Sequence, residues 1–176
     1  MESANNSCLR CGRCCTRFAV CITPFDIVRI AQATGMEPEK FMDIVPEPPA
    51  RERTEPALMI EGMPSLIVLK RDGKSVCCFY SESGCKVYSG RPMLCRSYPF
   101  RVPDTVLNLI DMRSRACPRR WLPEGEGRKQ YVRDCLQYAE EVRSYRKMAD
   151  EWNKTGGTMG EFLIFAILKA SESPPL

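Results

Sequence analysis

Cysteine is the residue type through which this chain could do chemistry, since its 176 residues include 11 cysteines and no histidine. A first run, C-L-R-C-G-R-C-C, contains Cys8, Cys11, Cys14 and Cys15, and a second stretch contains Cys77, Cys78, Cys85, Cys95 and Cys117. Because imidazole is absent, a metal here would be held mainly by thiolate sulfur. Ligation by sulfur alone is typical of four-cysteine zinc sites and of iron–sulfur clusters.

The spacing of the cysteines favours iron over zinc. C-x2-C lets one turn direct two sulfurs at one metal, and iron–sulfur proteins use a C-x2-C-x2-C run for three corners of a four-iron cluster. Cys14 and Cys15 are adjacent, so we expect their side chains to diverge and reach different metal ions. The second stretch lacks the paired C-x2-C layout of zinc ribbons. Zinc remains the alternative metal.

Seven arginines lie close in sequence to the cysteines: Arg10, Arg13, Arg17, Arg91, Arg96, Arg119 and Arg120. Positive charge lowers the pKa of a thiol and offsets the negative charge of a four-thiolate cluster. Arginine is also common on protein surfaces, and we expect most of these residues to be solvated. Only Arg91 and Arg96 are predicted to assist cofactor binding.

Length and composition predict the setting of the protein. The length suits one domain of about 100–200 residues. The net charge of +4 is too weak to argue for a nucleic-acid partner. The start, M-E-S-A-N-N-S, lacks the features of a secretory signal, and the apolar run Phe162–Leu168 is far shorter than the roughly 20 residues of a membrane span. We expect a cytoplasmic protein with a protein partner, and no partner of nucleic acid or membrane. In the reducing cytoplasm, a dense group of cysteines indicates a metal site more often than a set of disulfide bonds.

Residues 24–45 are predicted to be helical. Thr23 is a good N-cap and Asp26 places an acid in the first turn, while Gly35 suits the end of the helix. A second short helix is expected over Pro38–Val45.

A β-hairpin is predicted further along the chain. S-L-I-V-L-K and S-V-C-C-F-Y are rich in strand-forming residues, and Asp72-Gly73 between them is a strong turn signal. Residues 46–57 should form an exposed connector, and Val106–Met112 a further strand.

The C-terminal third is predicted to be helical. Apolar residues recur every three or four positions and form one stripe, made of Tyr131, Cys135, Tyr138, Val142, Tyr145, Met148 and Trp152. Thr158 and Glu161 then form a capping box that opens a last helix, Met159–Ala170.

Together these elements predict an α+β fold: one small, loop-rich, metal-centred domain over 1–176, with a β-hairpin and about four helices. Residues 1–22 and 77–117 would be the metal-binding loops, and 24–45 and 128–170 the helical parts.

The cysteine pattern resembles the YkgJ-type cysteine-cluster family, whose members are described as zinc- or iron-chelating. C-x2-C-x2-C-C is followed by C-x-F and by C-x-x-Y-x-x-R-P-x-x-C-R-x-Y-P-F, from Cys8 to about Cys117. Besides the cysteines, the pattern includes Phe79, Tyr88, Arg91, Pro92, Arg96, Tyr98 and Pro99. The resemblance implies eight thiolate ligands, enough for two four-ligand centres or one larger one: Cys8, Cys11, Cys14, Cys15, Cys77, Cys85, Cys95 and Cys117.

Three cysteines fall outside that set. Cys78 follows Cys77 on a predicted strand, so its side chain should point to the opposite face and be packed; the choice of Cys77 as the ligand rests on the family register. Cys135 lies in the apolar stripe of a helix and should be an ordinary buried thiol. Cys21 is left open between packing and a role as ligand or redox thiol.

The sequence predicts metal binding more firmly than any reaction. Without histidine the usual base at neutral pH is missing, and no G-x-S-x-G, P-loop or Rossmann pattern occurs. We expect an iron–sulfur protein, with one or two [4Fe-4S] clusters, that acts in redox or protein-maturation chemistry with a partner. The residues lean against an enzyme without deciding the question. A similar cysteine cluster occurs in flagellin lysine methylases. The alternatives are therefore an iron–sulfur-dependent enzyme of the lysine-methylation type or its accessory, and a structural zinc module that binds a protein.

Overall fold

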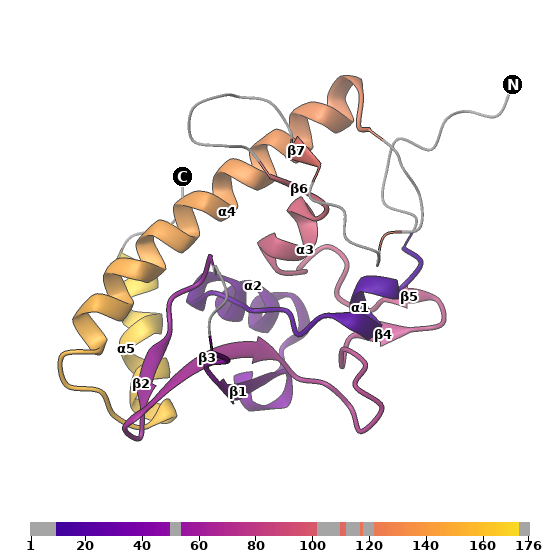
Figure 1. Ribbon diagram of the computed structural model, residues 1–176. Coiled ribbons are helices and arrows are strands. Elements are labelled where there is room, and N and C mark those ends of the chain that lie inside the picture. Colours follow the sequence, from indigo (N-terminus) through magenta and orange to yellow (C-terminus); the bar gives the residue numbers. More distant parts are fainter. Residues whose placement is uncertain (1–9, 50–53, 102–109, 112–116, 118–121, 173–176) are drawn as a thin grey trace, which may run out of the picture.

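The computed structural model describes residues 10–49, 54–101, 110–111, 117 and 122–172 (Figure 1). These residues form an α+β fold with five helices, as the sequence predicts in class: α1 Arg13–Arg17, α2 Pro24–Thr34, α3 Met93–Ser97, α4 Gly125–Trp152 and α5 Met159–Glu172. The strands are short: β1 Met42–Pro46, β2 Leu58–Ile60, β3 Met63–Leu69, β4 Tyr80–Ser81, β5 Gly84–Cys85, β6 Phe100–Arg101 and β7 Ile110–Asp111.

Helix α2 begins and ends where the sequence predicts. The Thr23 hydroxyl accepts a hydrogen bond from the Asp26 backbone N–H at 3.2 Å, and an Asp26 carboxylate oxygen accepts from the Thr23 N–H at 3.0 Å. Gly35 ends the helix in the left-handed conformation, with φ of 68°. Ile27 and Ile30 are fully buried. The capping box thus fixes the start of a helix whose inner face enters the core.

The prediction of a second helix over residues 38–45 is wrong. Pro38–Lys40 form a single 3-10 turn, and the chain then enters strand β1. β1 pairs antiparallel with β3, with Ile44 opposite Ile67. Pairing with β3 satisfies the backbone of these residues, and β-branched side chains suit a strand better than a helix.

The hairpin of the main sheet lies one segment earlier than predicted. β2 and β3 are joined by Glu61 and Gly62, whose φ angles of 49° and 79° are those of a tight hairpin turn. β3 is the central strand of the order β1-β3-β2, and the part of its edge beyond β2 is taken by Cys21, which bridges to Val68. Among the described residues, the chain after the Asp72-Gly73 turn therefore returns only as far as one bridge, between Arg71 and Cys77. A second small hairpin, β4–β5, follows.

Helices α4 and α5 cover the core, as the C-terminal pattern predicts. Most of the α4 stripe is buried, with Tyr145 only 1% exposed, and the Trp152 indole N–H donates to the Met59 carbonyl oxygen at 3.0 Å. The Thr158–Glu161 capping box opens α5. Figure 1 shows α5 beside the C-terminal end of α4, on the opposite side of the molecule from α1, β4 and β5. None of the described helices is both long and apolar enough to cross a membrane.

Two one-turn helices, α1 and α3, lie inside the segments predicted as cysteine loops. Each carries cysteines of the predicted ligand set. The predicted strand over 106–112 is seen only as β7, which pairs with β6; its other residues lie outside the described part of the chain.

Replacing Tyr145 by Phe is expected to leave the free energy of unfolding unchanged or raise it by up to about 1 kcal/mol, because a buried hydroxyl without a hydrogen bond costs about 1–3 kcal/mol. The Tyr145 hydroxyl has no hydrogen-bond partner among the residues that the structure describes. Tyr138→Phe is the matched control, since its hydroxyl donates to Glu55, and it should lower stability by about 1–2 kcal/mol. Urea unfolding measures both, and a larger loss in the Tyr145 variant would contradict this view of the core.

Candidate metal centre

The N-terminal cysteines are brought to the site by a glycine turn and one turn of helix. Gly12 precedes α1 with φ of 71°, and a Cβ atom at this position would overlap the Tyr80 ring of β4. α1 follows at once and carries Cys14 and Cys15, both partly buried. The absence of a side chain at Gly12 therefore lets the cysteine run lie directly against the β4–β5 hairpin.

The second cysteine segment meets the first through the backbone. The Cys77 N–H donates to the Cys15 carbonyl oxygen at 3.0 Å, so residues 62 positions apart are hydrogen-bonded neighbours. Cys77 is buried, Cys85 lies on β5 and Cys95 on α3.

Five thiols from these two segments act on one another electrostatically: Cys14, Cys15, Cys77, Cys85 and Cys95. Burial raises the pKa of Cys95 well above its ordinary value, and negative charge on Cys14, Cys77 and Cys85 raises it further. Burial likewise raises the pKa of Cys85, with charge on Cys77 and Cys14 adding to it. Thiols of raised pKa stay protonated at neutral pH, and a bound cation favours their ionisation. The donor set therefore fits a soft, positively charged metal centre.

The vicinal pair differs from its expected geometry. The sulfurs of Cys14 and Cys15 lie 4.0 Å apart, so the expected divergence of the two side chains is not seen. Two sulfurs on one tetrahedral zinc are separated by about 3.8 Å, given a Zn–S bond of about 2.3 Å. The separation of this pair thus suits two sulfurs on one metal ion.

The two thiols of this pair have opposite tendencies to ionise. A hydrogen bond from Cys15 lowers the pKa of Cys14 to about 6, and the positive charge of Arg91 also lowers it. The same hydrogen bond, with burial and the negative charge of Cys14, raises the pKa of Cys15. Cys77 resembles Cys14: a hydrogen bond from Cys78 lowers its pKa to about 7. The site therefore contains one thiol of lowered pKa from each segment.

The expectation that Cys78 points away from Cys77 on a strand is wrong, because Cys78 lies in a turn and its thiol is hydrogen-bonded to that of Cys77. The Cys78 thiol contacts the Phe41 carbonyl oxygen at 3.8 Å, and Cys78 is partly buried. Cys21 forms a bridge with Val68 of β3, and its charge acts on Tyr145 of α4. Cys135 is buried in α4, as expected, and its thiol contacts the Phe100 carbonyl oxygen at 3.6 Å.

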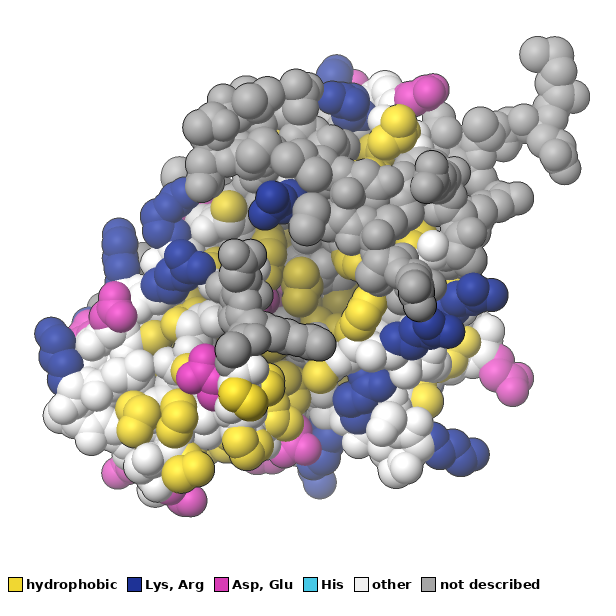
Figure 2. Space-filling view, viewed as in Figure 1, with side chains coloured by type: hydrophobic (Ala, Val, Ile, Leu, Met, Phe, Trp, Pro, Cys, Tyr) yellow, Lys and Arg dark blue, Asp and Glu magenta, His cyan; other side chains and the backbone are white. Residues whose placement is uncertain are grey.

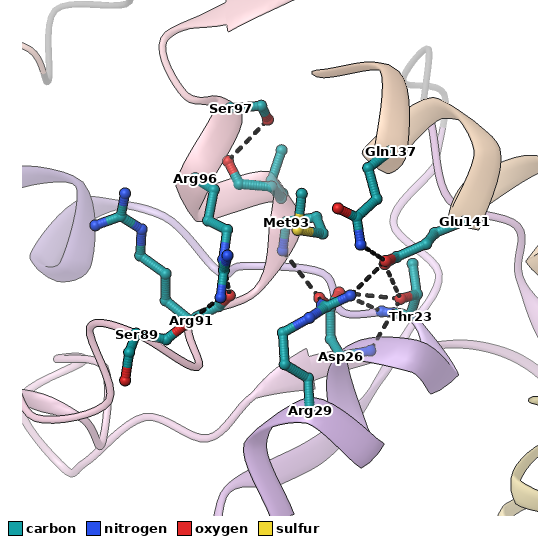
Figure 3. Close-up of polar contacts among 11 residues, drawn as sticks. Thr23, Asp26, Arg29, Ser89, Arg91, Met93, Arg96, Ser97, Gln137 and Glu141 are labelled. Carbon is teal, nitrogen blue, oxygen red and sulfur yellow. Dashed lines mark hydrogen bonds and ion pairs between the residues drawn. The ribbon is translucent and has the colours of Figure 1, made fainter. Parts of the chain in front are cut away.

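The arginines predicted to assist the cofactor have different surroundings. The guanidinium of Arg91 acts on Cys14 and Cys85 and lies 3.8 Å from the centroid of the Tyr88 ring. Arg10 lies at the same distance from this ring, which leaves room for the two groups only on opposite faces. Arg96 instead donates to the carbonyl oxygens of Arg91 and Ser89 (Figure 3). The Arg10 stack escaped the sequence prediction, which treated Arg10 as a solvated residue.

Positive charge is concentrated around the cysteines. Residues 10–25 and 70–91 contain eight Lys and Arg against two Asp and Glu, whereas the whole chain has 26 against 22. Figure 2 shows basic side chains gathered over α1 and the loop after β3, at the lower right. This charge offsets that of several thiolates.

The other predicted ligands are described only in part. Cys11 is exposed, and Cys117 is partly buried between segments that lie outside the described residues. Cys8 lies outside them as well. Among the residues that the structure describes, no three cysteine or acidic side chains come close enough together to hold a metal ion. The five thiols form a neighbourhood of interacting pairs and not a closed coordination sphere.

Comparison with protein families decides the affiliation of the chain. The model of a family named CxxCxxCC, with the description "putative zinc- or iron-chelating domain", matches residues 7–118, more than half of the chain. The chain belongs to the CxxCxxCC family. The resemblance noted from the sequence is thereby confirmed, and metal binding through the cysteine cluster is supported. Neither a curated protein nor a solved structure matched the chain.

For this CxxCxxCC protein, labelling of the metal-free chain by iodoacetamide at pH 7 is expected to occur faster at Cys14 than at Cys15. Only the thiolate is nucleophilic. With a pKa of about 6, Cys14 is mostly ionised at pH 7, whereas Cys15, whose pKa is raised, stays protonated. The preference should shrink as the pH falls below 6. Peptide mass spectrometry measures it, and Cys15 is a neighbour of similar exposure. Equal rates at pH 7 would contradict the assignment, and Arg91→Gln should slow labelling of Cys14.

Proposed function

We propose that this protein binds an iron–sulfur cluster of the [4Fe-4S] type through its thiolates and serves redox or protein-maturation chemistry together with a protein partner. The observation that carries the proposal is the mutual effect of five thiols, from two distant segments, on one another's pKa. Four sulfurs hold either a zinc ion or a [4Fe-4S] cluster, so the number of thiols does not separate the two. The irregular spacing of Cys77, Cys85 and Cys95, without the paired layout of zinc ribbons, favours iron.

The protein's own residues prepare the site for a metal in three ways. Cys14 and Cys77 supply thiolates at neutral pH, and the other thiols release protons as a metal binds. Arg91 contributes positive charge beside Cys14 and Cys85. Partial burial of Cys14, Cys15, Cys85 and Cys95 limits the access of water. A bound cluster supplies one-electron transfer, with a potential that depends on charge, hydrogen bonds to sulfur and solvent exposure.

A structural zinc site is the second candidate. The 4.0 Å separation of the Cys14 and Cys15 sulfurs favours it, because both can then contact one tetrahedral ion. In that case the metal would stabilise the loops, and the surface of the domain would bind a protein partner.

Anaerobic purification followed by analysis of iron, zinc and acid-labile sulfide distinguishes the two candidates. We expect a brown protein with iron and sulfide in equal amounts and a paramagnetic resonance signal on reduction. Cys77→Ser and Cys95→Ser should lose iron, whereas Cys135→Ser, whose thiol contacts the Phe100 carbonyl oxygen, should retain it. A colourless protein with stoichiometric zinc would contradict the iron proposal. An iron without a cysteine ligand, or binding of S-adenosylmethionine, would favour the enzymatic alternative.

A further inference from the structure

The short helix that carries Cys95 is held at its start by a side chain from another helix. The backbone N–H of Met93, the first residue of α3, donates to an Asp26 carboxylate oxygen at 2.9 Å (Figure 3). The preceding residue is Pro92, which has no side-chain acceptor to cap the helix. Asp26, on α2, is fully buried and lies 67 residues earlier in the chain.

The Asp26 carboxylate is fixed from every side. Its second oxygen accepts hydrogen bonds from the backbone N–H and the hydroxyl of Thr23, both at 3.0 Å. Arg29 pairs with Asp26 and also with Glu141 of α4. Glu141 is 1% exposed and accepts from the Gln137 side chain at 2.9 Å. With so many partners, the carboxylate has little freedom to follow α3 if that helix moves.

Helix α2 also contacts the loop before α3. A Cβ atom on Gly90 would lie 2.5 Å from the Ala33 side chain and 3.5 Å from the Arg29 carbonyl oxygen, so the loop touches α2 directly. Arg96 ties the ends of this loop by donating to the carbonyl oxygens of Ser89 and Arg91. The segment from 89 to 97 therefore rests on α2 both before and at the start of α3.

We propose that Asp26 is a positioning residue of the metal site, which sets through its hydrogen bond to Met93 where α3 presents the sulfur of Cys95. The proposal rests on the proposed function, in that Cys95 is taken as a metal ligand. A helix of one turn is not stable alone, so contacts from outside must fix it. Groups that orient a ligand without touching the metal are typically needed for full metal affinity.

Cadmium titration of the metal-free protein tests this role. The thiolate-to-cadmium absorption counts Cd–S bonds, and competition with a chelator gives the affinity. Asp26→Ala should weaken cadmium binding by about 10- to 100-fold and lose about one Cd–S bond, as Cys95→Ser should. Asp26→Asn should also weaken cadmium binding, but less than Asp26→Ala, because a single amide oxygen remains to accept from the donors on both sides of the carboxylate. Glu141→Gln is the matched control: it alters the same buried cluster, leaves the Met93 hydrogen bond in place and should keep the wild-type number of Cd–S bonds.

A double variant separates positioning from a general loss of structure. In the Cys95→Ser background, Asp26→Ala should not weaken cadmium binding further, because there is no sulfur left to place. Two outcomes would overturn the proposal and leave the proposed function intact. In one, the losses of cadmium affinity in the two single variants add up in the double variant; in the other, Asp26→Ala binds cadmium as the wild type does while Cys95→Ser binds it more weakly. If Asp26→Ala does not fold, Asp26→Asn takes its place, and wild-type binding by Asp26→Asn, or a loss that adds to that of Cys95→Ser, overturns the proposal. Equal binding by Cys95→Ser and the wild type would refute both the ligand assignment and the positioning role.

Discussion

Arg29→Met is expected to lower the free energy of unfolding by about 3–5 kcal/mol at pH 8, the loss typical of removing one partner from a buried ion pair. Arg29 is the cation between Asp26 and Glu141, whose side chains are fully buried. Methionine keeps the apolar stem and removes the charge. Two carboxylates would then face each other without a counter-charge, in surroundings where an unpaired charge is costly.

The loss should depend on pH in a defined direction. Burial, and then the charge of Asp26, raise the pKa of Glu141, and Arg29 opposes this, so its removal should raise the pKa further. A carboxyl group with a raised pKa binds its proton more tightly in the folded chain, so stability falls as the pH rises from the ordinary value of 4.5 through the raised one. The deficit of Arg29→Met should therefore be small near pH 4 and largest at pH 8.

Urea unfolding of the metal-free protein at several pH values measures this effect. Arg143→Met is the matched control, because Arg143 is 58% exposed and pairs with Glu140 at the surface of α4. It should cost less than about 1 kcal/mol at any pH. Adding Glu141→Gln to Arg29→Met should restore part of the stability, since one of the two opposed charges is then gone. A deficit that does not change with pH would contradict an electrostatic origin.

The same cluster shows how far local patterns predict the fold. Thr23 and Asp26 were expected to cap α2, and they do. The other oxygen of Asp26, however, accepts from Met93, and Arg29 reaches Glu141, 112 residues away. A capping box follows from residues three apart, whereas a hydrogen bond between distant helices depends on how the whole chain packs. Periodicity alone likewise did not predict β1, whose conformation depends on its pairing with β3.

The candidate site was predicted in its chemistry and only partly in its geometry. The type and spacing of the cysteines indicated a thiolate metal centre, and the segments that carry Cys14 and Cys77 meet as expected. The sequence placed no constraint on the helix that holds Cys95, or on the ring that Arg10 and Arg91 share. The first depends on Asp26 of α2, which accepts from Met93, and the second on Tyr88, 78 residues beyond Arg10, so both are long-range contacts.

Gly12→Ala is expected to weaken metal binding strongly, by at least tenfold in cadmium affinity, because an alanine at this position would be strained in its backbone and would also collide with a neighbour. With φ of 71°, alanine would be strained by about 1–2 kcal/mol. In addition, the new methyl group would overlap the Tyr80 ring, which is held in β4. The run that carries Cys11, Cys14 and Cys15 would have to move away from Cys77.

Two matched variants separate strain from overlap. Gly35, at the end of α2, has φ of 68°, and a Cβ atom added to it would have no neighbour within 4 Å among the described residues. Gly35→Ala should therefore lose only about 1 kcal/mol of stability and keep its cadmium affinity. Tyr80→Ala removes the ring, so the Gly12→Ala/Tyr80→Ala double variant should bind cadmium more tightly than Gly12→Ala alone. Wild-type cadmium binding by Gly12→Ala would contradict the view that close contact between this glycine and the hairpin places the cysteine run. In that case the hydrogen bonds of α1 to Cys77 and Arg71 would fix its position.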